Sequence, residues 1–170
     1  MKILVLWARE GATNLGVQAL GEGTRALAAR AFPGAEVRTH GTGGAALPGN
    51  DGPANIFRPK RMALEAVRGG EFKRWLKSFD LVLDTRAGDS FAEIYGLEQL
   101  AKMTPVGELA QRWGVPVVLT PQTIGPFDSR RGRALARRSI HTAALVMTRD
   151  SRSARVASAL GRVPDVVASD

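Results

Sequence analysis

Hydrophobic residues follow two alternating patterns along the chain. Short continuous apolar runs are typical of strands that are buried on both faces of a sheet. Between these runs lie longer stretches in which apolar residues return every three or four positions, as in amphipathic helices. The apolar runs predict strands at residues 2–7, 35–39, 80–84, 115–120, 145–148 and 163–168.

The periodic stretches predict helices between these strands. The first helix covers residues 15–31 with Asn14 as its N-cap, and we expect it to bury one stripe that consists of Val17, Leu20, Thr24, Leu27, Ala28 and Ala31. Helical pattern returns over residues 60–78, with an interruption near Gly69 and Gly70.

Four more helices are predicted in the second half of the chain. Thr104 followed by Pro105 is typical of an N-cap and a first helical position, which divides this region into helices at 93–103 and 105–113. Asp128 or Ser129 caps a helix that ends near residue 141, and Asp150 caps one that ends near residue 160.

This regular alternation of strand and helix predicts an α/β fold of the Rossmann-like type. Such a fold has a mostly parallel sheet with helices on both faces. Residues 40–59 depart from the alternation because they are rich in Gly, Pro and Asn and have no period. A loop of this length is usually functional or disordered.

The composition of the chain indicates a globular protein and excludes several kinds of site. The 170 residues are 44% hydrophobic, which is enough for one globular domain. The absence of cysteine excludes disulfides, thiolate nucleophiles and thiolate metal sites. The first apolar run is too short for a secretion signal, and no stretch reaches the roughly 20 apolar residues that span a bilayer. We therefore expect a soluble, cytoplasmic protein.

The chain is basic, with a formal net charge of +8. Much of the charge is arginine in two stretches, residues 58–77 and 130–138. These stretches are either solvated helix faces or surfaces for a phosphorylated ligand or a phospholipid membrane, and the last interpretation predicts a membrane-associated protein. Nucleic acid is not an expected partner, because aromatic residues do not alternate with the basic ones.

Polar and glycine residues gather where the predicted strands end. In a parallel sheet, ligands bind at the carboxyl ends of the strands. Four strands are followed by candidate ligand-binding residues: Asn14 and Gly16 after the first, Gly88, Asp89 and Ser90 after the third, Gln122 and Gly125 after the fourth, and Arg149 after the fifth.

Each candidate has a structural and a functional interpretation. Asn14 and Gly16 fit a helix cap, or a helix N-terminus that presents N–H groups to an anion. They form neither a dinucleotide fingerprint nor a P-loop. Asp89 is suited to act as a base or to bind a sugar hydroxyl. Arg149 is suited to bind a carboxylate or phosphate through two hydrogen bonds, or to pair with Asp150.

The remaining residues offer little catalytic chemistry. We expect neither His40 nor His141 to be catalytic, and no nucleophile elbow supports a Ser-His-Asp triad. The His, Asp and Glu residues lack the spacing of metal ligands, so we expect no metal and no cofactor.

In their order and spacing, these motifs resemble the polysaccharide pyruvyl transferase family. The resemblance rests on residues 14–17, 84–91, 95–96, 122–127 and 148–153, and residues 168–170 resemble the start of a further family segment. One departure is Val17, where the family usually has Asp.

The resemblance implies transfer of an enolpyruvyl unit from phosphoenolpyruvate to a nucleotide- or lipid-linked sugar, with a pyruvate ketal as the product. It also implies two Rossmann-type domains in a GT-B-like architecture. Residues 1–170 would then be the N-terminal domain, without the C-terminal domain that carries the catalytic His, and we expect this chain alone to be inactive. Arg149 would contact an anion, whereas Asn14, Asp89, Ser90 and Gln122 would make polar contacts, mainly with the sugar.

Two alternatives remain open. The chain could be half of a GT-B-type nucleotide-sugar glycosyltransferase, which would bind a nucleoside diphosphate in place of phosphoenolpyruvate. It could also be a basic, non-enzymatic module that docks on an anionic membrane or on nucleic acid. The acceptor sugar, the catalytic acid and the oligomeric state stay unassigned.

Overall fold

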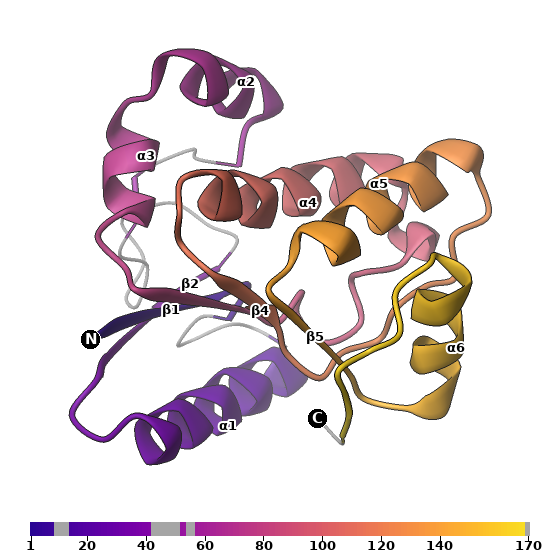
Figure 1. The fold of residues 1–170 in the computed structure, drawn as a ribbon, viewed down its shortest axis with the longest axis horizontal. Helices are drawn as coiled ribbons and strands as arrows, with labels where there is room; N and C mark the ends of the chain where they lie inside the picture. The colour runs from indigo at the N-terminus through magenta and orange to yellow at the C-terminus, as the bar shows by residue number, and fades with distance from the viewer. Residues whose placement is uncertain (9–13, 42–51, 54–56, 169–170) are drawn as a thin grey trace.

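A parallel sheet with helices on both faces forms the protein (Figure 1). The computed structural model describes residues 1–8, 14–41, 52–53 and 57–168. The strands are β1 (Lys2–Leu6), β2 (Glu36–His40), β3 (Leu81–Asp84), β4 (Val117–Leu119), β5 (Leu145–Thr148) and β6 (Val166–Val167). The predicted α/β, Rossmann-like fold is therefore confirmed. Most of the predicted 40–59 loop lies outside the described residues, as do residues 169 and 170.

The strand order β2-β1-β3-β4-β5-β6 determines where a ligand fits. All neighbouring strands in this order pair in parallel. From β1 the chain first moves to one side, to β2, and then to the other side through β3. This is one of the common orders of doubly wound sheets, and its switch point lies between β1 and β3.

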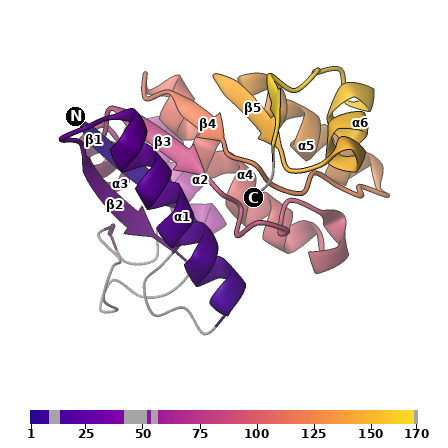
Figure 2. The ribbon, with the colours of Figure 1, turned by 90° about the horizontal axis from the view of Figure 1, so that it is seen from below.

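The helices are distributed unequally over the two faces. They are α1 (Leu15–Ala31), α2 (Pro59–Arg68), α3 (Glu71–Leu76), α4 (Leu97–Arg112), α5 (Arg130–Thr142) and α6 (Ser151–Ala159), and a 3₁₀ turn, η1, covers Glu93–Tyr95. Helix α1 covers one face of the sheet near β1 and β3, whereas α4 and α5 pack on the opposite face (Figures 1 and 2).

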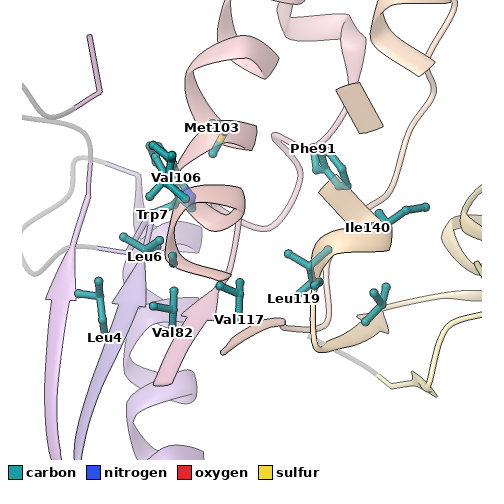
Figure 3. Close-up of a cluster of buried hydrophobic side chains, with 14 of the residues drawn as sticks. Leu4, Leu6, Trp7, Val82, Phe91, Met103, Val106, Val117, Leu119 and Ile140 are labelled. Atoms are coloured by element: carbon teal, nitrogen blue, oxygen red, sulfur yellow. The ribbon is translucent and has the colours of Figure 1, made fainter. Parts of the chain in front are cut away.

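The main core lies between the sheet and helices α4 and α5. Alternate residues of the strands point into it, among them Leu4, Leu6 and Val82 (Figure 3). Met103 and Val106 of α4 meet these residues from the helical side. Burial of this apolar surface is the main force that holds α4 on the sheet.

Helix α1 has the predicted bounds, but the predicted buried stripe is wrong in part. Thr24 and Ala28 are buried, whereas Leu27 is 68% exposed and Ala31 is also exposed. The reason is the close approach of the helix to the end of β1. A Cβ atom on Gly21 would lie only 3.0 Å from the Cβ of Ala8, so the face with small residues turns inward and Leu27 moves outward.

The prediction of two helices, at 93–103 and 105–113, is wrong, because α4 is one helix with Pro105 inside it. The Thr104 hydroxyl is not a cap and donates a hydrogen bond to the Leu100 carbonyl at 3.0 Å. Residues 103–104 and 106–110 are buried against the sheet and α5. This packing keeps the helix continuous past the proline, although proline removes one N–H donor.

The interruption near Gly69 and Gly70 is confirmed, because α2 ends at Arg68 and α3 begins at Glu71. The Glu65 carboxylate spans the break and accepts hydrogen bonds from the backbone N–H groups of Phe72 and Lys73. The turn between the two helices is therefore held by a side chain of the first.

Candidate functional site

Beyond β3 and β4 the chain continues as two segments joined by backbone hydrogen bonds. We call them the β3 segment (residues 84–93) and the β4 segment (residues 120–127). The bonded pairs are Asp84 with Thr120, Gly88 with Thr123, Phe91 with Gly125 and Glu93 with Pro126, at N···O distances of 3.1, 2.8, 2.9 and 2.9 Å. The hydrogen bonds therefore hold the two segments side by side at the edge of the sheet where ligands are expected.

A buried ion pair holds the start of the β3 segment. Arg86 Nε lies 2.8 Å from Asp84 Oδ2, and both side chains are fully buried. Arg86 also donates to Ser139 Oγ of α5 at 2.7 Å, and its guanidinium lies 4.3 Å from the centre of the Phe91 ring. Burial raises the pKa of Asp84, and the nearby Arg86 guanidinium opposes this change.

These contacts support a strained turn. Arg86 and Ala87 have φ values of 48° and 53°, in the left-handed region that residues with a side chain seldom adopt. The turn aims the chain toward α1, where a Cβ on Gly88 would lie 3.4 Å from Leu20 Cδ2. The buried Arg86 thus determines where Gly88 and the next residue, Asp89, lie.

A hollow of about 370 Å³ opens between the two segments and the start of α6. Its lining includes the predicted residues Asp89, Gly125 and Arg149, together with Thr123, Arg152 and Ser153. Gly125 is required there because its φ is +83° and a Cβ would lie 2.9 Å from Val156 Cγ1. We take this hollow as the candidate site.

The α6 end of the hollow is suited to an anion. Arg149 and Arg152 lie beside the helix N-terminus, and the first turn of α6 contains no acidic residue. The N-cap is Asp150, whose Oδ1 accepts from Ser153 N at 2.6 Å, a hydrogen bond that lowers the pKa of Asp150. Arg149 Nε lies 3.6 Å from Asp150 Oδ2. The helix dipole and two guanidiniums therefore favour an anion here, and the Asp150 carboxylate offsets part of their positive charge.

An oriented carboxylate also lines the hollow. Asp89 is exposed, and its Oδ2 accepts a hydrogen bond of 2.6 Å from the Tyr95 hydroxyl. This hydrogen bond raises the pKa of Tyr95. Ser90 donates a long hydrogen bond of 3.5 Å to the other Asp89 oxygen. Asp89 can still accept a hydrogen bond from a ligand hydroxyl, because a carboxylate has several acceptor positions.

Gln122 is the most unusual of the predicted residues. Its side chain is fully buried, yet neither Oε1 nor Nε2 has a hydrogen-bond partner. Its backbone carbonyl accepts from Arg149 N at 3.3 Å, so it lies beside the end of β5. Thr123 Oγ1 and Thr148 Oγ1 at the same strand ends are also buried without partners. Buried polar groups without partners are rare and often mark a site for water or a ligand.

Asn14 and Gly16 lie outside this hollow. Asn14 Oδ1 accepts from Gly16 N and Val17 N at 2.9 and 3.3 Å, so the Asn14 side chain acts as a helix cap. Gly16 lines a second hollow of about 450 Å³ between α1 and the β4 segment, together with Leu20 and Pro121. Of the predicted residues, three line the first hollow and Gly16 lines the second. The residues that line neither hollow are Asn14, Gly88, Ser90 and Gln122.

The sequence analysis did not identify Thr123 and Arg152 as site residues. Thr123 lies between Gln122 and Gly125, in a segment after a strand end of which residues 123–126 all line the hollow. Arg152 lies in the first turn after a strand end, which is the usual place for anion contacts. Both positions could have been identified from the same rule that identified Arg149.

The two histidine side chains contact other groups of the fold and do not line the candidate site. The His40 ring is buried against Trp75 and Phe57, and its Nδ1 accepts from Gly52 N at 3.1 Å. His141 Nε2 lies 3.1 Å from the Leu160 carbonyl oxygen. Within the described ranges no group of three or more His, Asp or Glu residues is arranged to hold a metal ion. In the same part of the chain, no helix combines the length and apolarity that a membrane span requires.

Comparison with known proteins agrees with the motifs that line the site. The family model for polysaccharide pyruvyl transferase matches residues 14–169, which include both segments and the start of α6. No curated protein matches the chain. The matched range covers most of the sequence, so the predicted resemblance is confirmed, and membership implies a transferase that acts on a sugar or polysaccharide acceptor. This chain belongs to the polysaccharide pyruvyl transferase family.

Proposed function

We propose that the hollow beside α6 binds phosphoenolpyruvate and a sugar, and that the pyruvyl group is transferred between them to form a ketal. The observation that carries this proposal is that Arg149 and Arg152 at the start of α6 line the same hollow as the oriented carboxylate of Asp89. The guanidiniums are suited to an anionic donor and the carboxylate to a hydroxylated acceptor.

The donor carries a phosphate and a carboxylate, and both need cationic or N–H partners. Arg149 is suited to one of these groups through its planar guanidinium, which can make two parallel hydrogen bonds. Arg152, which lies beside the start of α6, is suited to the other group. Family membership supports a pyruvyl donor in general, and the two guanidiniums that line the hollow support this particular donor.

The acceptor requires hydrogen-bond acceptors and an apolar surface. Asp89 is suited to accept from a sugar hydroxyl, with its second oxygen held by Tyr95. The exposed Ile94 lines the same hollow and offers an apolar surface to the face of a sugar ring. Together these residues would orient the two hydroxyls that become the ketal oxygens.

The proposed reaction joins two sugar hydroxyls to one carbon. The first hydroxyl adds to carbon 2 of phosphoenolpyruvate while an acid protonates the methylene carbon, which becomes a methyl group. The proton that this hydroxyl loses replaces the one that the acid gave. The second hydroxyl then displaces phosphate from carbon 2, and its proton leaves with the phosphate. Cations stabilise the departing phosphate and the carboxylate throughout. We assign no acid among the described residues, and propose that a second, C-terminal domain supplies it.

The experiment compares the 170-residue chain with the product of the complete reading frame. Each is incubated with phosphoenolpyruvate labelled in the pyruvyl group and with nucleotide- and lipid-linked sugars. We expect label in the sugar and release of phosphate only with the complete product. Turnover by the 170-residue chain alone would overturn the proposal of a second domain.

Two variants test the site itself. In the complete product, Arg149→Ala is expected to weaken phosphoenolpyruvate binding by about tenfold to a hundredfold, since a charge-assisted bidentate contact is lost. Arg30→Ala on the far end of α1 is the matched control and should leave binding unchanged. Tight binding of a nucleoside diphosphate, without label transfer, would replace this proposal by a glycosyltransferase.

A further inference from the structure

Helix α2 exposes an apolar stripe bordered by basic residues. Leu64 and Val67 are 53% and 86% exposed, and their spacing of three places them on the same side of the helix. Lys60 lies one turn before Leu64 and Arg68 one turn after it, and both are exposed. We call these four residues the α2 face.

The acidic residue of this helix is turned away from the α2 face. Glu65 is buried and accepts hydrogen bonds from Phe72 N and Lys73 N at 3.3 and 3.4 Å. Arg61, on the flank of the helix, pairs with Glu71 at 2.8 Å. The exposed charge of the α2 face is therefore only positive.

The surroundings of the α2 face are also basic. Figure 1 shows α2 at the outer end of the helical layer, on the same side of the sheet as α5. Between α2, α4 and α5 lies a hollow of about 260 Å³, lined by Met62 and alanines with Arg112 and Arg138. Glu108 also lines it, and this carboxylate pairs with Arg138 at 2.7 Å. Burial raises the pKa of Glu108.

We propose that the α2 face docks the protein on a bilayer that contains anionic phospholipid. Leu64 and Val67 would enter the boundary between head groups and acyl chains, while Lys60 and Arg68 contact the lipid phosphates. Short amphipathic helices with this arrangement lie in the plane of the membrane surface.

Charge complementarity selects an anionic surface, and the two exposed aliphatic side chains favour lipid over nucleic acid. Nucleic-acid surfaces of this kind rely on basic and aromatic side chains, and the α2 face has no aromatic residue. The proposal does not depend on the proposed function, because the α2 face shares no residue with the candidate site.

The first test is co-sedimentation of the full chain with vesicles of phosphatidylcholine, with and without phosphatidylglycerol. We expect binding only when phosphatidylglycerol is present. Leu64→Ser with Val67→Ser, and separately Lys60→Glu with Arg68→Glu, should each reduce binding by about tenfold or more.

Matched controls change equally exposed residues elsewhere. Leu15→Ser with Val163→Ser alters two aliphatic residues that are 77% and 76% exposed. Arg30→Glu with Arg155→Glu changes the net charge as much as the reversal on α2. The aliphatic control should bind like the unmodified chain. The arginine control changes only the net charge, so it should lose much less binding than Lys60→Glu with Arg68→Glu, and circular dichroism checks that all variants are folded.

A second test detects insertion directly. The chain contains no cysteine, so Val67→Cys provides a single position for an environment-sensitive fluorophore. We expect its emission to shift to the blue with phosphatidylglycerol vesicles, and no shift for the same label at Val163→Cys.

Several results would overturn the proposal. These are no binding of the unmodified chain to phosphatidylglycerol vesicles, equal binding to pure phosphatidylcholine, or full binding after the two serine substitutions. Binding to DNA that depends on Lys60 and Arg68, combined with an unshifted label at position 67, would assign the face to nucleic acid instead.

Discussion

At the scale of single residues, we expect substitution of Gln122 to affect stability and ligand binding in opposite directions. Its buried amide has no hydrogen-bond partner, which costs about 1–3 kcal/mol in a folded protein. We predict that Gln122→Leu raises the free energy of unfolding by about 1 kcal/mol while it weakens ligand binding. Urea denaturation and calorimetric titration with phosphoenolpyruvate measure the two effects.

Thr24→Val is a suitable control for this substitution, because Thr24 is buried in α1 and does not line the candidate site. If Gln122→Leu destabilised the protein and left ligand affinity unchanged, the amide would have a structural role instead.

The sequence identified some site residues and left others undecided. Asp89, Gly125 and Arg149 could be predicted, because the carboxyl ends of parallel strands meet at one edge. Asn14 could not be assigned, since a helix cap and an anion contact need the same residue type at the same position. The role of Arg86 was not foreseen, because its burial depends on Ser139, which lies 53 positions away.

At the scale of secondary-structure elements, the start of α5 depends on a carboxylate from another element. Glu93 Oε2 accepts from Ser129 N at 2.8 Å, and a Cβ on Gly132 would overlap this carboxylate. Hydrogen bonds from Ser129 lower the pKa of Glu93 below its ordinary value of 4.5. A carboxylate with a lowered pKa stabilises the fold above the unfolded value and loses this effect as the pH falls.

We therefore predict that Glu93→Gln lowers the melting temperature by a few degrees at pH 7, and that the difference from the unmodified chain shrinks below pH 4.5. Thermal unfolding across this pH range measures it. Gly132→Ala should reproduce the loss at neutral pH, although alanine normally stabilises a helix interior. A Gly132→Ala variant more stable than the unmodified chain would contradict the overlap.

Helix α4 gives a second prediction at this scale. Pro105→Ala restores one backbone N–H donor inside the helix, so we expect it to raise the free energy of unfolding by about 1–3 kcal/mol. Urea denaturation measures the change. Exposed Ala134 of α5 is the control position, where Ala134→Pro should destabilise the protein by a comparable amount. A destabilising Pro105→Ala would show that the proline ring is needed for packing.

Element types were more predictable than element boundaries. The bounds of α1 follow from its period and from the N-cap Asn14, which are local features. The division of α4 was wrong because Thr104-Pro105 reads as a helix start in any single sequence. Only the burial of residues on both sides of Pro105, through contacts with distant strands and α5, keeps this helix whole.

At the scale of the whole molecule, the net charge of +8 acts on every anionic ligand. We predict that phosphoenolpyruvate affinity falls by about threefold to tenfold as the salt concentration rises from about 0.05 to about 0.5 M. Calorimetric titration at several salt concentrations measures this. Arg30→Glu with Arg155→Glu reduces the net charge by four, from +8 to +4, and should flatten the dependence. An affinity unaffected by salt would mean that local contacts dominate.

The class of the fold was predictable, whereas the strand order was not. Alternating strands and helices require a mostly parallel sheet whichever strands are neighbours. The placement of β3 next to β1 depends on pairs such as Ile3 with Leu81, which local patterns do not contain. The exposed side of α1 was unpredictable for the same reason, since Gly21 meets Ala8 only after the sheet has formed.

The hydrogen bonds between the β3 and β4 segments have a consequence for the dynamics of the site. The amides of Thr123, Gly125 and Glu93 donate to backbone carbonyls, as amides inside a sheet do. They should therefore exchange with deuterium slowly, although they lie in loops. A ligand that meets such a preorganised surface loses little affinity to ordering the chain, because the backbone that presents the hollow is already in place.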